Sequence, residues 1–179
     1  MHRSSLIGAG LQNRSLSATL LLLAVVFPFE LAFALPDDHD QKVEIESETA
    51  EFREAEGLTI YTGNVHLKQG SILLRADTLT AFVESGQVHR LLAEGDAYYE
   101  QTPEIGSEKV VARGKTIEYL LADDIITLNQ NASLTQEGAT LNGNLITYDV
   151  KNHLLKANSL PGSGDDRIRV TLPPMTRSE

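Results

Sequence analysis

The chain has 179 residues, contains no cysteine and carries a formal net charge of −10 at pH 7. A surface this acidic repels nucleic acid and anionic membranes, so we expect no nucleic-acid partner. Without cysteine no disulfide can hold the chain together, and the fold must depend on buried apolar surface.

The first 34 residues have the order of a secretory signal peptide. Arg3 and Arg14 make a basic start, residues 16–29 are mostly apolar, and small residues lead up to Ala34. The apolar run is shorter than the roughly 17–25 residues that span a bilayer, although an uncleaved anchor is the alternative interpretation. We predict cleavage after Ala34 and export to the periplasm. The remainder of the chain is long enough for one domain with a sizeable core.

After a flexible acidic lead-in at residues 35–41, one domain is predicted over residues 42–174, followed by a tail at 175–179. Alternation of apolar and polar residues indicates β-strands throughout this domain. In residues 58–62, the side chains of Leu58 and Ile60 are assigned to the apolar face. Residues 49–56 have a helix-forming composition, but their place between two strands favours strand and turn. The predicted strands include 42–46, 58–62, 65–67, 72–76, 79–83 and 167–172.

A short phrase occurs three times, as GNVHLKQ from Gly63, GDAYYEQ from Gly95 and QNASLTQ from Gln130. The copies begin 32 and 35 residues apart, and a fixed period of this size is typical of stacked repeats. We interpret each copy as a turn followed by a half-buried strand.

A second phrase lies between the copies of the first, as ADTL from Ala76, GKTI from Gly114 and GNLI from Gly143, with IESE from Ile45 as a diverged copy. The two phrases predict strands of about five or six residues separated by frequent turns. The chain is therefore expected to be all-β, in a sandwich, roll or solenoid.

Residues suited to catalysis or metal binding form no recognisable site. There is no Gly-x-Ser-x-Gly motif and no glycine-rich phosphate loop, and the histidines after Ala34 are scattered without the paired spacing of a zinc site. The acidic residues 37–40 could hold a divalent ion, but a solvated chain end is the simpler interpretation. We expect no catalytic residues, no cofactor and no metal.

The apolar faces of the predicted strands allow two interpretations. They can form an ordinary filled core, which would make the protein a structural β-repeat scaffold without a lipid ligand. They can instead line an apolar groove, in which each buried acyl methylene would stabilise a lipid by about 0.8 kcal/mol.

Taken in order, five motifs resemble the OstA-like lipopolysaccharide-transport family, and the similarity extends over about residues 41–173. With a predicted signal peptide and no appended barrel, the chain is most similar to the soluble periplasmic member of that family. The motifs are IESE from Ile45, YTGNV from Tyr61, QG from Gln69, AD from Ala76 and GNLITY from Gly143.

The resemblance implies an open, V-shaped antiparallel β-jellyroll of about three to four repeated strand units. It also implies a non-enzymatic carrier that conveys lipopolysaccharide from the inner to the outer membrane and contributes to outer-membrane assembly. The groove would bind the lipid A acyl chains. Its expected residues are Val43, Tyr99, Tyr119 and Leu121, matched by motif, with Ile45, Ile117 and Leu134 added from the apolar face.

The resemblance further implies docking by pairing of strand edges. The N-terminal edge, with Val43 and Ile45, would meet an inner-membrane-anchored partner. The C-terminal edge, with Ile168 and Val170, would meet the periplasmic domain of an outer-membrane translocon. Copies of the chain would also stack head to tail.

Overall fold

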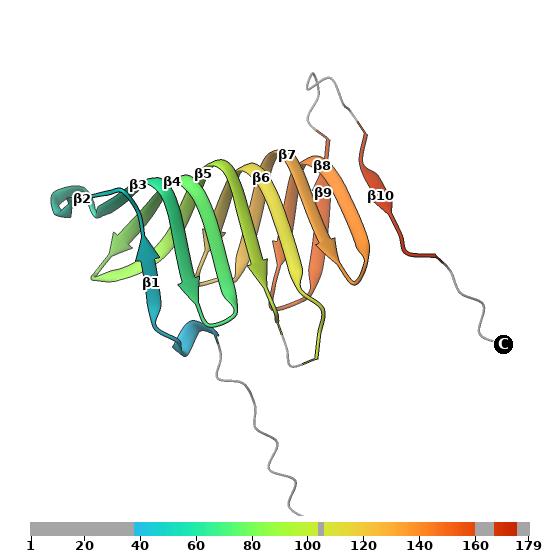
Figure 1. Cartoon of the computed structure of the whole chain (residues 1–179), viewed down its shortest axis with the longest axis horizontal. Coiled ribbons are helices and arrows are strands. Elements are labelled where there is room, and N and C mark those ends of the chain that lie inside the picture. The colour runs from blue at the N-terminus through green and yellow to red at the C-terminus, as the bar shows by residue number, and fades with distance from the viewer. Residues whose placement is uncertain (1–37, 104–105, 160–166, 175–179) are drawn as a thin grey trace, which may run out of the picture. The chain divides into compact units, whose positions relative to one another are not determined.

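The computed structural model describes residues 38–103, 106–159 and 167–174, all within one compact unit, Ala34–Glu179. The predicted signal peptide, its cleavage site and the predicted tail lie outside the described residues. The described chain forms a 10-stranded antiparallel sheet with two short 3-10 helices, so the all-β prediction is confirmed (Figure 1). The elements are η1 (Asp38–Asp40), β1 (Val43–Glu46), β2 (Thr49–Arg53), η2 (Glu54–Glu56), β3 (Leu58–Gln69), β4 (Ile72–Glu84), β5 (Gln87–Gln101), β6 (Val110–Leu120), β7 (Ile125–Gln136), β8 (Ala139–Asp149), β9 (Leu154–Asn158) and β10 (Arg169–Thr171).

The sheet is unclosed and has two edges. Its strand order is β1-β3-β4-β5-β6-β7-β8-β10, while β2 pairs with β3 beside β1, and β9 pairs with β8 beside β10. Each edge is therefore made of two short strands that share one long neighbour, and the two edges lie at opposite ends of the stack (Figure 1).

The first repeated phrase lies in the middle of long strands, so the prediction that it forms turns between short strands was wrong. Strands β3 to β8 have 11–15 residues each. Within β5, Gly95 and Asp96 have φ values of 86° and 45°, and the equivalent positions of β3 and β7 also have positive φ. Glycine and asparagine tolerate this conformation in a strand as readily as in a turn, so the same residues can bend a strand without ending it.

The second phrase lies opposite the first on the neighbouring strands. Between β3 and β4 the register passes from Thr62↔Thr78 to Val65↔Ala76, which leaves one more residue on β3 than on β4. The same one-residue bulge recurs at each later pairing of β4 to β8. Because a bulge bends its strand, this line of bulges folds the sheet into two layers (Figure 1).

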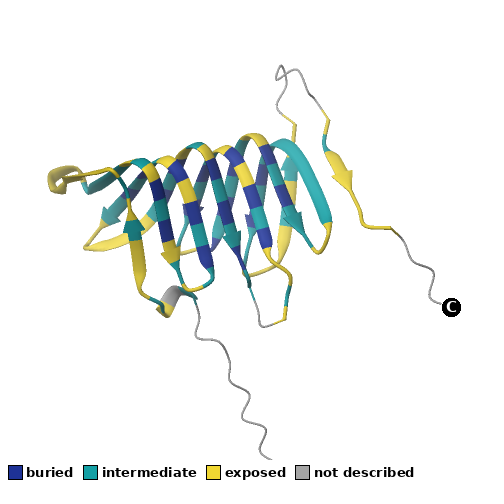
Figure 2. Ribbon diagram, in the orientation of Figure 1, coloured by how far each residue is buried: buried dark blue, intermediate teal, exposed yellow. Residues whose placement is uncertain are grey.

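The two layers are named here by their edge strands. The β1/β10 layer contains β1, β10 and the halves of β3–β8 that pair between them, and the β2/β9 layer contains β2, β9 and the other halves. The buried residues come from both layers and form one hydrophobic cluster between them. Burial is greatest in the middle strands and falls toward β1 and β10 (Figure 2).

Residues 49–56 form β2 and η2, which confirms strand and turn there.

The prediction of which side chains of residues 58–62 point inward was wrong. Tyr61 pairs with the buried Leu79 and packs against the core, whereas Leu58 and Ile60 belong to the opposite face. Both faces of this segment carry a large side chain, so alternation alone could not decide which one points inward.

Candidate functional site

A row of inward-facing side chains crosses the whole β1/β10 layer from edge to edge. It includes three predicted groove residues, Ile45, Tyr99 and Leu134, and it ends at the predicted docking residue Val170. Each member is the register partner of the next, in the order Ile45, Leu67, Leu74, Tyr99, Ala112, Leu134, Leu141 and Val170.

The β2/β9 layer supplies the facing wall of the interior. Tyr119 pairs with Leu91 and Ile126, and Ile117 pairs with Ala93 and Leu128. The rings of Tyr99 and Tyr119 meet edge to face, with centroids 6.4 Å apart and an interplanar angle of 69°. Two predicted groove residues thus contact each other across the two layers.

The hydroxyl groups of these two tyrosines are satisfied within the protein. Tyr99 Oη donates to Gln101 Oε1 at 2.7 Å, and Tyr119 Oη donates to Asp124 Oδ1 at 2.8 Å. Burial is the main reason that the pKa of Tyr99 lies well above 10. The Tyr99 phenol therefore acts as a neutral donor at neutral pH.

Part of the predicted flexible lead-in is tied to the sheet near Tyr99. Gln101 Nε2 donates to Asp38 Oδ2 at 3.0 Å. Asp38 also accepts hydrogen bonds from the backbone N–H and the Oγ of Ser71, at 2.6 and 2.7 Å. The sequence contained no signal for this role, because an acidic residue near a chain end is usually solvated.

The centre of the interior is packed with side chains. Tyr99, Ile117, Tyr119 and Leu134 are all at most 5% exposed, so these predicted groove residues are part of the core. Ile45 and Leu121 are partly buried against that core. The remaining predicted site residues lie at the edges, where Val43 is 47% exposed and Ile168 is partly buried.

The interior opens into a pocket of about 590 Å³ at the β10 end. Leu134, Leu141 and Val170 come from the β1/β10 layer, and Leu155 comes from β9 in the other layer. Their side chains give the pocket an apolar wall, which suits an acyl chain. Sequence reasoning missed Leu155, although its spacing from Ala157 shows the alternation of a half-buried strand.

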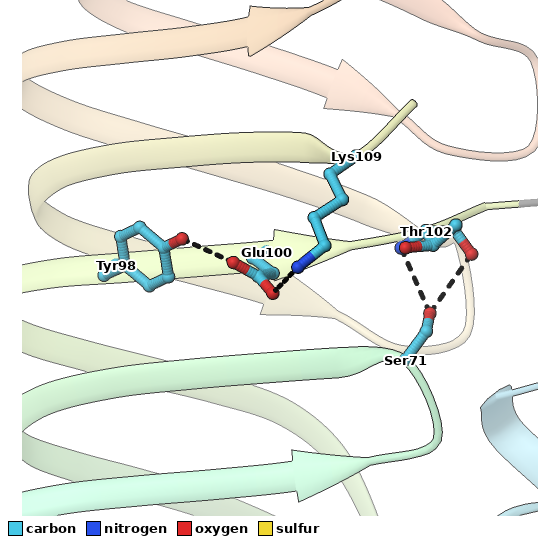
Figure 3. A network of polar contacts seen from close by, with 5 residues as sticks. All are labelled: Ser71, Tyr98, Glu100, Thr102 and Lys109. Atoms are coloured by element: carbon cyan, nitrogen blue, oxygen red, sulfur yellow. Dashed lines mark hydrogen bonds and ion pairs between the residues drawn. The ribbon is translucent and has the colours of Figure 1, made fainter. Parts of the chain in front are cut away.

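A polar network lies on the outer side of β5 (Figure 3). Glu100 accepts hydrogen bonds from Lys109 Nζ at 2.7 Å and from Tyr98 Oη at 2.6 Å. The bond from Lys109, followed by the bond from Tyr98, holds the pKa of Glu100 below its ordinary 4.5. Ser71 Oγ accepts a hydrogen bond from the backbone N–H of Thr102 at 3.1 Å, which links two adjacent loops.

These contacts fasten the outer surface and bring together no nucleophile with an activating base. Across residues 38–103, 106–159 and 167–174 there is no group of His, Cys, Asp and Glu side chains arranged to hold a metal ion. Within the same ranges, no helix has the length and apolar character needed to cross a membrane.

Comparison with known proteins gives matches over most of the chain. Residues 44–153 match the family described as LptA/(LptD N-terminal domain) LPS transport protein. The lipopolysaccharide export system protein LptH of Pseudomonas aeruginosa is 33% identical over 135 residues, which cover 74% of this chain and 77% of LptH. The lipopolysaccharide export system protein LptA of Haemophilus influenzae is 33% identical over 160 residues, which cover 87% of this chain and 90% of that protein.

A solved structure has the same fold. The crystal structure of P. aeruginosa LptH, described as the LptA-homologous periplasmic component of the lipopolysaccharide transport device, superposes with a TM-score of 0.71 at 30% identity. The match covers 78% of this chain and 100% of the LptH chain, and it confirms the open β-jellyroll. The chain therefore belongs to the LptA/(LptD N-terminal domain) family of LPS transport proteins.

Proposed function

We propose that this protein is a non-enzymatic periplasmic carrier that conveys lipopolysaccharide from the inner to the outer membrane and so contributes to outer-membrane assembly. The observation that carries the proposal is the apolar row from Ile45 to Val170, which crosses an unclosed sheet from one edge to the other. The relatives of this chain are named as lipopolysaccharide export proteins, and one of them is described as periplasmic.

In this proposal the acyl chains enter between the two layers while the sugars and phosphates remain in water. Each acyl methylene removed from water contributes about 0.8 kcal/mol, which makes a basic patch unnecessary for binding. Because the centre is packed, the layers must separate for lipid to pass Tyr99 and Tyr119. The end pocket beside Leu134 and Leu155 offers space without that separation. The residues proposed to contact lipid are Val43, Ile45, Tyr99, Ile117, Tyr119, Leu121 and Leu134.

The two edges are proposed to dock on partners by strand addition. The edge with Val43 and Ile45 would meet the inner-membrane-anchored partner, and the edge with Ile168 and Val170 would meet the outer-membrane translocon. Val43 and Val170 are 47% and 60% exposed, an unusual position for β-branched apolar residues unless another strand covers them. Head-to-tail stacking of copies would use the same two edges and would join their interiors.

The packed centre favours one alternative, a structural scaffold with a filled core and no lipid ligand. A photo-crosslinking amino acid at Leu155, which lines the end pocket, should capture lipopolysaccharide. The same amino acid at the adjacent, exposed Lys156 is the matched control and should not. Capture at neither position, or at Lys156 alone, would support the scaffold instead.

A further inference from the structure

The phenol hydroxyl of Tyr148 is buried without a hydrogen-bond partner. The residue is 1% exposed, and within the described part of the chain its Oη is the buried side-chain polar atom that lacks a partner. Tyr99 and Tyr119, the other two buried tyrosines of the interior, both donate to a side chain of the protein. An unpaired buried hydroxyl destabilises the fold, and phenylalanine would fill the same space without that cost.

Tyr148 stands next to the end pocket. It is the register partner of Leu155, which lines that pocket, and of Ile126 on its other side. Leu155 and Leu141, which also lines the pocket, pack against the cluster that contains Tyr148. Tyr148 is therefore one strand position away from a side chain that lines the apolar pocket, although it does not line the pocket itself.

The hydroxyl of Tyr148 is in the right protonation state to donate. Burial, and then the charge of Asp149, raise the pKa of Tyr148 above its ordinary value of 10. A neutral phenol in apolar surroundings forms a stronger hydrogen bond than it would in water, because no solvent competes for it. An oxygen atom on an acyl chain that enters between the two layers is a partner of the required kind.

We propose that Tyr148 is a specificity-determining residue that donates a hydrogen bond to a hydroxyl oxygen carried along an acyl chain. This inference rests on the proposed lipid-carrier function and names the feature of the lipid that the interior recognises. An unsubstituted chain buries the same apolar area but leaves the Tyr148 hydroxyl unpaired. The discrimination thus arises from satisfying a polar group that is already buried.

Binding of 3-hydroxydodecanoate and of dodecanoate tests the proposal, with calorimetric titration of each into the whole protein. The two probes share a carboxylate and a chain length and differ by one hydroxyl. We expect the unaltered protein to prefer the hydroxylated probe by about tenfold, the size of one hydrogen bond. In Tyr148→Phe the preference should vanish while dodecanoate binds as before, and the thermal midpoint should be equal or higher.

Tyr98→Phe is the matched control, because it removes a hydroxyl that already has a partner in Glu100. It should keep the preference and lower the thermal midpoint. Equal affinity for the two probes in the unaltered protein, or a preference that survives in Tyr148→Phe, would overturn the proposal. Purified lipopolysaccharide is titrated in the same assay, and its failure to bind the unaltered protein would count against the proposed function itself.

Discussion

Tyr99 and Tyr119 come from different layers and different strands, yet their rings meet edge to face at a centroid distance of 6.4 Å. The contact joins the two layers in the middle of the stack, where the interior is packed most completely. In the proposed carrier the same two rings stand in the path of the acyl chains. The side chains that stabilise the empty protein are therefore those that must give way when lipid passes.

Replacement of Tyr99 by alanine should destabilise the fold strongly. The change removes a ring that is 1% exposed and leaves Gln101 without its donor, so we expect a loss of about 3–5 kcal/mol in the free energy of unfolding. Urea denaturation followed by circular dichroism measures the loss. The neighbouring Tyr98→Ala is the control and should cost only about 1 kcal/mol, because Tyr98 faces outward. Equal losses would show that the two layers are not joined through this ring.

The line of β-bulges across the sheet predicts that two glycine substitutions differ in their cost to stability. Gly95 has φ of 86°, and a methyl group added there would meet Asp77 Cβ at 2.6 Å. Gly86 has φ of 78°, but a methyl group would have nothing within 4 Å. Gly86→Ala should cost about 1–2 kcal/mol of backbone strain, and Gly95→Ala about 3 kcal/mol because crowding adds to strain. Thermal unfolding compares them, and equal midpoints would contradict a structural role for the bulge.

The pair of Glu100 and Lys109 predicts a small dependence of stability on pH. The hydrogen bond from Lys109 lowers the pKa of Glu100 in the folded protein, so its contribution is complete above the ordinary value of 4.5. The contribution is lost as the pH falls through the lower, folded-state pKa. Lys109 is 61% exposed, so the loss should stay below about 1 kcal/mol.

Urea titrations between pH 7 and pH 3 measure this effect as the difference in the free energy of unfolding between the unaltered protein and Glu100→Gln. In a Lys109→Met background the same Glu100→Gln substitution should have a smaller effect, since the main cause of the shift is gone. If the effect of Glu100→Gln on the free energy of unfolding were unchanged in that background, the lowered pKa of Glu100 would be assigned to the hydrogen bond from Tyr98 instead.

Edge pairing between copies can be tested by cysteine cross-linking, because the chain has no cysteine of its own. Glu44 on β1 and Thr171 on β10 both face away from the interior row, so cysteines at these positions would lie on one side of a joined sheet. The double variant should form a disulfide-linked ladder on a non-reducing gel. Glu44→Cys with Arg113→Cys, in the middle of the sheet, should form no ladder. A ladder in this control alone would contradict head-to-tail stacking.

Alternation of apolar and polar residues was enough to predict an all-β chain and most of its inward-facing residues. Ile45 and Leu134 were assigned to one apolar face from local sequence, and the register places them in one row. Such predictions succeed because the side-chain period of a strand is a local property. The motif order was also sufficient to recognise the family, which the match over residues 44–153 confirms.

Only the tertiary structure decided what the repeated phrase does. Positive φ at Gly95 and Asp96 is compatible with a turn or with a bulge, and the choice depends on the neighbouring strands that continue past it. Contacts between distant parts of the chain also decide three other features. They turn Tyr61 inward, hydrogen-bond Asp38 to the sheet and leave the hydroxyl of Tyr148 without a partner. The sequence by itself determined which side chains can be buried. The folded sheet decided which ones meet, because contacts between layers have no signature in local spacing.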